Sequence, residues 1–507
     1  MRSHHERPPA KEGAAGRPER SASLLLGLDL GTTTTRALLF DLSGRPVAEA
    51  YREVPVAHPR PNWAEFDPMA CWRATTEVIG QVLRQRGVSP TDVMAVGLTG
   101  LLHALVPVDA AQNPLARAML WMDHRCAEEA AWLAREWGDL VRCATGHGAV
   151  TTTCSAPKLR WLVKNEPDLV AETAKFLPVK DFVRLKLTGQ IATDPSDAAG
   201  TMLLDRRTGD WCLPLLEAIG VPVEKLPPIR GSSEVAGGVT PSAAAMTGLV
   251  AGTPVVLGGG DTTTTRIGAD AEGSGRACLY LGTAAWVAVP QRLAGRLVAT
   301  ATTGAALRWL VELLDGGQPD APSVAYSALL ARAAAAPPGA GGLVFLPHLM
   351  GERGPVYNPE AKGVLFGLTL AHGRAEVARA VLEGCAFHIR SILEQLTGEP
   401  LEEITVVGGG AKSPLWSAII ASVTGLDVLV PEVAEAGALG AAILAGVGIG
   451  VYDSVAAAAS QLVRIAARYA PDPAQQRRYD RLYAVYLDLE ARMTELYGRV
   501  PLGEDVD

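Results

Sequence analysis

Residues 24–40, LLLGLDLGTTTTRALLF, decide the fold expected for this chain. Two apolar runs separated by a glycine and a threonine run predict a β-hairpin, with Gly31 supplying the tight turn and the hydroxyl run Thr32 to Thr35 at its tip. Small residues at such a tip let backbone N–H groups approach an anion, and the carboxylate of Asp29 beside them could hold a hydrated cation. The same pattern is also typical of an ordinary hairpin that binds nothing.

A second hairpin of the same plan is expected later in the chain. Residues 277–289, ACLYLGTAAWVAV, again place an apolar run, a Leu-Gly-Thr turn and another apolar run in this order. Internal similarity of this kind indicates a duplicated domain. We expect the two turns, with Gly31 in one and Gly282 and Thr283 in the other, to face one ligand across a cleft.

The composition indicates a globular protein of several domains. At 507 residues the chain is too long for one hydrophobic core, so two or three domains are expected. The net charge of −8 argues against a nucleic-acid partner, because phosphate binding needs a dense basic face. No apolar run reaches the roughly 20 residues that a membrane span requires. Seven scattered cysteines favour reduced thiols in a cytoplasmic protein over disulfides or a zinc site.

Strand-like and helix-like patterns alternate along the first part of the chain, which indicates a layered α/β architecture. Residues 333–342 are expected to form a low-complexity loop, and residues 455–498 to form terminal helices. The expected strands lie at 24–30, 35–41, 46–56, 92–98 and 103–108, and the expected helices at 68–86, 125–137 and 155–166.

The two hairpins suggest where one domain ends and the other begins. The first lobe is expected at about 24–267 and the second at about 268–495, followed by a tail at 496–507. Residues 1–23 are rich in Arg, Glu, Pro and Gly and lack the apolar core of a signal peptide. They are therefore expected to form a disordered extension.

Two glycine clusters each follow an apolar strand. PVVLGGGD (254–261) ends in Asp261, and ITVVGGGAKSPLW (404–416) continues into a helix that Ser413 can cap and Pro414 can start. Backbone without side chains lets a flat or anionic group lie against it. A triple glycine alone is weak support for a nucleotide contact.

Together these motifs resemble the FGGY carbohydrate kinases of the actin/Hsp70/hexokinase superfamily, from about residue 24 to 450. The resemblance implies an α/β, two-lobed ribonuclease-H-like (actin-like ATPase) fold with a cleft between duplicated domains. The blocks most similar to the family's signatures are GVLFGL (363–368) with EVARAVLE (376–383), and SAPKLRW (155–161). Further similar blocks are WMDHR (121–125), KDFVRLKLTG (180–189), DPSDAAGTMLLD (194–205) and FLPHLMGER (345–353).

The resemblance implies phosphoryl transfer from ATP, with Asp261 as the general base that takes a proton from a sugar hydroxyl. Without the family pattern, Asp261 could equally cap the turn after its glycines. Asp29 would hold Mg²⁺ through water. The implied phosphate and nucleotide contacts are Gly31, Thr32, Thr33, Gly282, Thr283, Gly408, Gly409, Gly410, Ala411, Lys412 and Gly437.

The sugar site is implied by GLTGLLH (97–103), which resembles the family's substrate strand and ends at His103. A lone histidine is also often structural. Trp63 would line the pocket or plug the edge of the lobe, and Asp123 would reach the sugar or form a surface ion pair with Arg125. The implied substrate contacts are Trp63, Asp67, Leu102, His103, Asp123 and Thr262.

Within the family the sequence is most similar to xylulokinases, but it departs from them beside the sugar. Leu101 and Leu102 stand where that pattern has Gln-Met, and Thr262 stands where it has Asn. The stretch between Thr283 and Trp309 is also shorter than usual, which could weaken nucleotide binding. The expected reaction is phosphorylation of D-xylulose, with gluconate, ribulose, erythritol or another polyol as alternatives.

A different class of function is a non-catalytic ATP-binding or ATPase switch protein of the same superfamily, and the retained Asp261 argues against it. The chain has no Gly-Lys-Ser/Thr element and no His-Arg-Asp loop, which excludes P-loop enzymes and protein kinases. The expected partner is a small sugar or polyol, without nucleic acid or membrane, in a protein that could form a homodimer.

Overall fold

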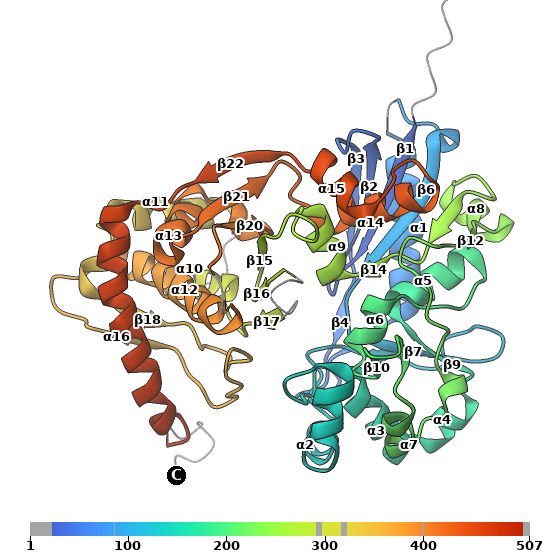
Figure 1. The fold of residues 1–507 in the computed structure, drawn as a ribbon, viewed down its shortest axis with the longest axis horizontal. Helices are drawn as coiled ribbons and strands as arrows, with labels where there is room; N and C mark the ends of the chain where they lie inside the picture. The colour runs from blue at the N-terminus through green and yellow to red at the C-terminus, as the bar shows by residue number, and fades with distance from the viewer. Residues whose placement is uncertain (1–22, 86, 291–296, 316–321, 398–399, 500–507) are drawn as a thin grey trace, which may run out of the picture.

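The computed structural model describes residues 23–85, 87–290, 297–315, 322–397 and 400–499. Two lobes, each built on one large sheet, lie side by side (Figure 1). The expected extension 1–23 lies outside the described residues except for its last residue. Residues 500–507 of the expected tail and 291–296 of the shortened stretch lie outside them as well.

The first sheet has the strand order β12-β13-β6-β1-β2-β3, and β14 pairs with β6. The strand β1 is antiparallel to β2 and parallel to β6, and β2 is antiparallel to β3. The strands are β1 (Leu24–Leu30), β2 (Thr34–Asp41), β3 (Pro46–Glu53), β6 (Val93–Gly100), β12 (Val235–Gly238), β13 (Pro254–Val256) and β14 (Gly259–Gly260).

The second sheet repeats this plan with the order β17-β16-β15-β20-β21-β22. Three antiparallel strands are again followed by two parallel strands and one antiparallel edge strand. This shared plan confirms the duplication that the two hairpins predict. The strands are β15 (Ala277–Leu281), β16 (Ala285–Ala288), β17 (Leu297–Ala299), β20 (Glu403–Val407), β21 (Asp427–Pro431) and β22 (Ile465–Tyr469).

The remaining elements cover these sheets or form the lower part of the first lobe (Figure 1). The helices of the first lobe are α1 (Pro68–Leu83), α2 (Ala127–Leu140), α3 (Ser155–Asn165), α4 (Pro167–Glu172), α5 (Val179–Thr188), α6 (Pro195–Gly200), α7 (Leu213–Ile219), α8 (Pro241–Thr247) and α9 (Asp261–Gly268). Those that follow are α10 (Gly304–Asp315), α11 (Pro322–Ala335), α12 (Arg374–Leu396), α13 (Pro414–Thr424), α14 (Ala436–Gly448), α15 (Val455–Leu462) and α16 (Pro473–Tyr497). The short strands are β4 (Val56–Ala57), β5 (Glu65–Phe66), β7 (Leu105–Val108), β8 (Ala118–Met119), β9 (Lys175–Pro178), β10 (Leu204–Asp205), β11 (Asp210–Trp211), β18 (Val344–Leu346) and β19 (Val364–Phe366).

The predicted elements of the first lobe are confirmed within a few residues, and two predictions further on are wrong in part. The loop expected at 333–342 is helical as far as Ala335, because α11 extends through its alanines. The terminal helices expected over 455–498 are separated by β22, which pairs with β21 and closes the second sheet. None of the described helices is long and apolar enough to span a membrane.

The strand β1 is apolar on both faces because both faces are covered. Its alternate leucines, starting from Leu24, pack into the core beneath α1 and α5. On the opposite face Leu25 packs into a different core, which contains residues of α14 and α15. The opposite face also carries Gly27 and Asp29, since side chains two residues apart share a face. The pattern LLLGLDL therefore places Asp29 on the face that α14 covers.

Helices α14 and α15 pack on the first sheet although they follow most of the second lobe in the chain (Figure 1). The expected second lobe, 268–495, therefore includes two helices that complete the core of the first lobe. Their close approach depends on glycine. A Cβ at Gly27 would lie 2.1 Å from the carbonyl oxygen of Ala438, and a Cβ at Gly97 would lie 1.9 Å from that of Ala441.

The contact between α14 and α9 is equally close. A Cβ at Gly440 would lie 1.9 Å from the carbonyl oxygen of Thr264, and one at Gly268 would lie 1.9 Å from that of Ala436. Atoms cannot approach so closely, so any larger side chain at these positions must push α14 away from the sheet.

We expect Gly440→Ala to lower the free energy of unfolding by about 1–3 kcal/mol or more, because the added methyl group overlaps the backbone of α9. Chemical denaturation monitored by circular dichroism measures the change. Gly148→Ala is the matched control, since a Cβ at Gly148 meets no atom within 4 Å. Equal stability of the two variants would contradict the close packing of α14.

Candidate active site

Two carboxylates converge at one end of the first sheet. The register pairs Asp29 of β1 with Thr99 of β6, and on the other side of β6 it pairs Gly259 of β14 with the same Thr99. Asp261 follows two residues later as the first residue of α9. The hairpin and the glycine cluster, far apart in the sequence, therefore bring Asp29 and Asp261 together.

The environment of this pair raises both pKa values. Burial, with a contribution from the charge of Asp29, raises the pKa of Asp261 to about 7. Burial also raises the pKa of Asp29 to about 6, although the nearby cation of Arg36 lowers it and Glu435 raises it again. Two neighbouring carboxylates that resist ionisation provide oxygen ligands for a hard divalent cation and a base that titrates near neutral pH.

A network of buried side chains holds the loop that carries Asp261. The backbone N–H of Gly260 donates to Ser196 Oγ at 2.8 Å, and Ser196 Oγ in turn donates to Asp194 Oδ2 at 2.5 Å. The fully buried ammonium of Lys180 lies 3.3 Å from Asp194 and donates to the carbonyl of Leu257 at 2.9 Å. The charged side chains of Lys180 and Asp194 therefore fix the turn before α9.

One of the expected nucleotide contacts lies near the carboxylate pair. Gly437, in the first turn of α14, lies beside the carboxylates, because a Cβ there would be 3.6 Å from Asp29 Oδ2 and 3.5 Å from Thr265 Oγ1. The structure therefore places Gly437 with the Mg²⁺ candidate Asp29.

The second lobe contributes one residue to this region that the sequence analysis missed. The charges of Asp29 and Asp261 help burial to raise the pKa of Tyr280, which shows that its hydroxyl lies within their electrostatic reach. Tyr280 is the one exposed residue of β15 and stacks on Trp286, with ring centroids 5.7 Å apart. The sequence feature that could have revealed it is the single aromatic residue, Tyr280, in the apolar run 277–281.

The two hairpin tips lie in ordered turns. In the first, the N–H of Gly31 donates to the carbonyl of Thr34 at 2.9 Å, and Trp121 Nε1 donates to Thr32 Oγ1 at 3.1 Å, while Thr33 is exposed. In the second, the carbonyls of Gly282 and Thr283 accept from backbone N–H groups at the start of α10. Both tips keep small residues at the surface of their lobe.

The triple glycine between β20 and α13 is mostly explained by packing. Gly408 has a φ of +91°, and a Cβ there would lie 2.8 Å from the carbonyl oxygen of Leu281. A Cβ at Gly410 would lie 2.8 Å from Leu281 Cβ, whereas one at Gly409 meets nothing within 4 Å. Of the next two candidates, Ala411 is buried and Lys412 is exposed. The predicted cap and start of α13 are confirmed, with Ser413 Oγ accepting from Trp416 N–H.

Two of the expected sugar residues lie beside Asp261. The N–H of Thr262 donates to Asp261 Oδ1 at 2.7 Å. The side chain of Leu102 packs over Gly260, where a Cβ would lie 2.3 Å from its Cδ2. Leu101 instead points into the core of the first lobe, so of the two leucines only Leu102 borders this site.

Two others, Trp63 and His103, line a cavity of about 360 Å³ together with Lys158. His103 Nδ1 donates to the carbonyl of Gly200 at 2.6 Å, and burial lowers the pKa of His103 to about 3, so the ring is neutral. Lys158 Nζ donates to the carbonyl of His103 at 3.2 Å, and burial lowers its pKa to about 8.

The last two expected contacts have structural partners. Asp123 is fully buried and forms an ion pair of 2.7 Å with Arg125, so a surface pair is the wrong description. The guanidinium of Arg125 also lies 3.4 Å from the ring centroid of Trp63. Asp67 caps α1 by accepting from Met69 N–H, and it pairs with Arg73. Neither carboxylate lines the cavity.

The duplicated sheets and the paired carboxylates define an actin-like two-domain kinase, and comparisons with known proteins identify its family. The N-terminal domain of the FGGY family of carbohydrate kinases matches residues 24–268, and the C-terminal domain of that family matches residues 291–449. This chain belongs to the FGGY family of carbohydrate kinases, which are phosphotransferases. The predicted family and fold class are therefore confirmed.

Individual relatives cover nearly the whole chain. The chain is 34% identical to the xylulose kinase of Escherichia coli (strain K12) over 92% of this chain and 100% of the relative. It is 35% identical to a glycerol kinase of Gloeobacter violaceus over 85% of this chain and 89% of the relative. The crystal structure of a xylulose kinase from Rhodospirillum rubrum has a TM-score of 0.84 at 31% identity, with 94% of this chain and 100% of that chain covered.

The raised pKa values of the carboxylate pair predict a pH-dependent stability. The folded chain holds protons on Asp29 and Asp261 more tightly than the unfolded chain. The free energy of unfolding therefore falls as pH rises above about 4, and it stops falling once both groups are ionised in the folded chain, above about pH 7. We expect Asp29→Asn or Asp261→Asn to increase the free energy of unfolding at pH 8 by on the order of 1 kcal/mol.

Calorimetry without nucleotide or Mg²⁺ measures the effect. Each Asn variant should have a higher Tm than the natural chain at pH 8, and the difference should vanish at pH 4. Asp453→Asn, an exposed loop position, is the control and should shift the Tm at neither pH. Asn variants that match the control at pH 8 would show that the two carboxylates ionise in the folded chain at no cost in stability.

Proposed function

We propose that this kinase transfers the γ-phosphoryl group of ATP to a hydroxyl of a small sugar or polyol, with D-xylulose as the first candidate. The observation that carries the proposal is the convergence of Asp29 and Asp261 at the end of the first sheet, within the electrostatic reach of Tyr280 from the second lobe. The similarity to xylulose kinases over the full length supports the substrate class.

In this proposal Asp261 is the general base. Its carboxylate accepts the proton of the attacking sugar hydroxyl as that oxygen forms a bond to phosphorus and the bond from phosphorus to the ADP oxygen breaks. A base with a pKa near 7 suits proton transfer at neutral pH. The hydrogen bond from Thr262 N–H and the network beneath Gly260 orient the carboxylate. Phosphoryl transfer depends mainly on such alignment.

We also infer that Asp29 holds Mg²⁺. The residues fit the ion, because Asp29 and Asp261 are neighbouring oxygen donors, and a bound cation would offset the cost of ionising them in a buried site. When bound, Mg²⁺ would neutralise charge on the transferring phosphates. The exposed members of the expected nucleotide set are Thr33, Thr283, Gly409 and Lys412.

A substrate other than D-xylulose is a second candidate, supported by Leu102. This side chain lies against Gly260, next to the proposed base, and offers no hydrogen bond to a sugar hydroxyl. A sugar hydroxyl left unpaired there would lose about 1–3 kcal/mol of binding. A less hydroxylated or differently branched polyol fits this surface better. Gluconate and glycerol kinases among the relatives show that the family fold accommodates such variation.

We further propose a cytoplasmic location. All seven cysteines are free thiols and six of them are buried, which fits a reducing compartment.

We expect Asp261→Asn to lower kcat by roughly 10²-fold or more while ATP binding and the fold persist, because the variant cannot accept the proton. A coupled assay of ADP release measures turnover, and calorimetric titration measures nucleotide binding. Asp453→Asn should retain full activity. Near-normal turnover of Asp261→Asn would remove this residue from the chemistry.

We expect a panel of ketoses, polyols and aldonates to give a low kcat/KM for D-xylulose and a higher value for a less hydroxylated compound. Leu102→Gln should raise the kcat/KM for D-xylulose by about tenfold, because the amide adds a hydrogen-bonding group beside Asp261. Leu102→Met, of similar length but apolar, is the control. Efficient D-xylulose turnover by the natural chain, unchanged in Leu102→Gln, would contradict this interpretation of the site.

A further inference from the structure

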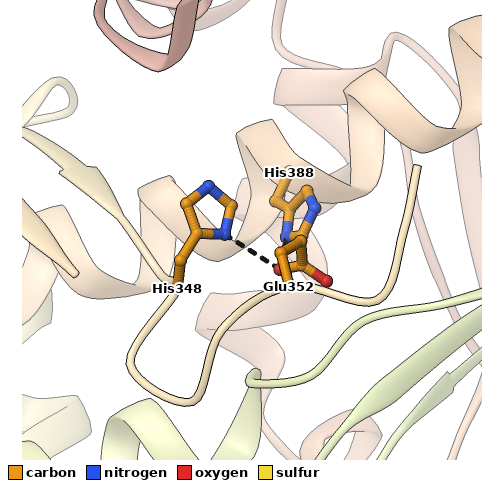
Figure 2. Close-up of side chains that lie close together, drawn as sticks. All are labelled: His348, Glu352 and His388. Atoms are coloured by element: carbon orange, nitrogen blue, oxygen red, sulfur yellow. Dashed lines mark hydrogen bonds and ion pairs between the residues drawn. The ribbon is translucent and has the colours of Figure 1, made fainter. Parts of the chain in front are cut away.

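A second group of titratable side chains lies inside the second lobe, away from the carboxylate pair. His348 and Glu352 come from the segment between β18 and β19, and His388 comes from α12 (Figure 2). Glu352 Oε2 lies 2.9 Å from His348 Nδ1 and 3.6 Å from His388 Nδ1, and all three ligand atoms lie within 4.8 Å of one another. Each of the three residues is at most 5% exposed.

The outer atoms of all three side chains are held by other groups. His348 Nε2 lies 3.3 Å from Glu490 Oε1 of α16, and His388 Nε2 donates to the carbonyl of Gly354 at 2.9 Å. Glu352 Oε1 accepts backbone N–H groups from Ala301, Arg353 and Gly354. Metal-binding histidines characteristically donate their second N–H to a carboxylate or a backbone carbonyl, which fixes the tautomer and aims the first nitrogen at the ion.

His388 Nδ1 points to a missing cation. Because Nε2 donates to a carbonyl, the neutral ring carries a lone pair on Nδ1, and that lone pair faces a carboxylate oxygen at 3.6 Å. His388 Nδ1 is buried and has no hydrogen-bond partner among the described residues. Leaving a buried acceptor unpaired is costly, so a positive group between the two atoms would stabilise both.

The charges of the cluster favour a divalent ion. Glu352 Oε2 lies 2.9 Å from His348 Nδ1 and Glu490 Oε1 lies 3.3 Å from His348 Nε2, so two carboxylates meet the imidazoles of the cluster. A divalent cation bound by the two imidazoles would balance the charge of these two carboxylates.

We propose that His348 Nδ1, Glu352 Oε2 and His388 Nδ1 bind one divalent transition-metal ion, with Zn²⁺ the best match. Ligand atoms about 2 Å from a tetrahedral ion lie about 3.3 Å from one another. The separations from Glu352 Oε2, 2.9 and 3.6 Å, bracket this value, and the two Nδ1 atoms lie within 4.8 Å of each other. Imidazole nitrogens select Zn²⁺ over Mg²⁺, which prefers oxygen. The fourth position would take water.

The ion would act as a structural tie. It would fasten the segment between β18 and β19 to α12 directly and to α16 through Glu490. The same segment carries Arg353, whose guanidinium lies 5.2 Å from the ring centroid of Trp121 in the first lobe. Trp121 in turn donates to Thr32 at the first hairpin tip. The proposed site therefore supports a contact between the lobes and is separate from the phosphoryl-transfer site.

The test is metal binding by the full-length chain after treatment with a chelator. The chain is titrated with Zn²⁺ and with Co²⁺ in excess Mg²⁺, so that the oxygen site at Asp29 is occupied by Mg²⁺. We expect one Zn²⁺ per chain by elemental analysis, a visible absorption spectrum of tetrahedral Co²⁺, and a Tm that rises with Zn²⁺ concentration. The affinity should fall as pH is lowered, because protons compete for the imidazole nitrogens.

His388→Gln and His348→Gln should abolish the stoichiometric metal, the Co²⁺ spectrum and the Zn²⁺-dependent Tm shift. His372→Gln, at a half-buried histidine of the same lobe outside the cluster, is the control and should keep all three. Asp29→Ala should also keep them, which separates this site from the proposed active site. Binding that is absent in the natural chain, or that persists in both cluster variants, would overturn the proposal and leave the cluster as an ion-pair network.

Discussion

The structure depends on the backbone-to-backbone contact of α14 with β1, β6 and α9. Gly27, Gly97, Gly268 and Gly440 each leave no room for even one added carbon. This contact covers the second face of the first sheet and so allows β1 to be apolar on both sides. It also brings the N-terminal turn of α14, with Gly437, against Asp29. The core of the first lobe and the environment of its carboxylates thus arise from the same close packing.

The buried environment of Asp29 and Asp261 suits these carboxylates to binding a cation and accepting a proton. Asp29 and Asp261 lie near each other because β1 and β14 flank the same strand, β6. Burial raises both pKa values, and the charge of Asp29 raises that of Asp261 further. The buried charges of Lys180 and Asp194 fix the loop beneath Asp261. A site of this kind is less stable than an apolar core would be, and it gains a cation-binding position beside a base matched to neutral pH.

Much of this was predictable where local patterns decide the structure. The hairpins, the helix cap at Ser413 and the meeting of two lobes follow from turn residues and apolar periodicity. The packing of α14 on the first sheet could not be predicted from the sequence. Gly27 and Gly97 indicate that another segment lies close to the sheet, but they do not identify that segment. The role of Asp67 as the cap of α1 was not predicted, because capping and ligand contacts favour the same residue type. Gly408 and Gly410 serve packing against Leu281, which a triple glycine cannot distinguish from nucleotide contact. The cluster of His348, Glu352 and His388 joins positions from different elements, so no spacing in the sequence revealed it.

The place of α14 and α15 in the chain also bears on how the protein is made. Synthesis delivers the strands of the first sheet early, but the helices that cover one face of β1 and β6 arrive only after residues 436–462 leave the ribosome. Until then Leu25, Phe40 and Ala95 lack their apolar neighbours, so the nascent first lobe is exposed to aggregation while most of the second lobe is translated. The two lobes therefore do not mature in order of synthesis, and the first is completed almost last.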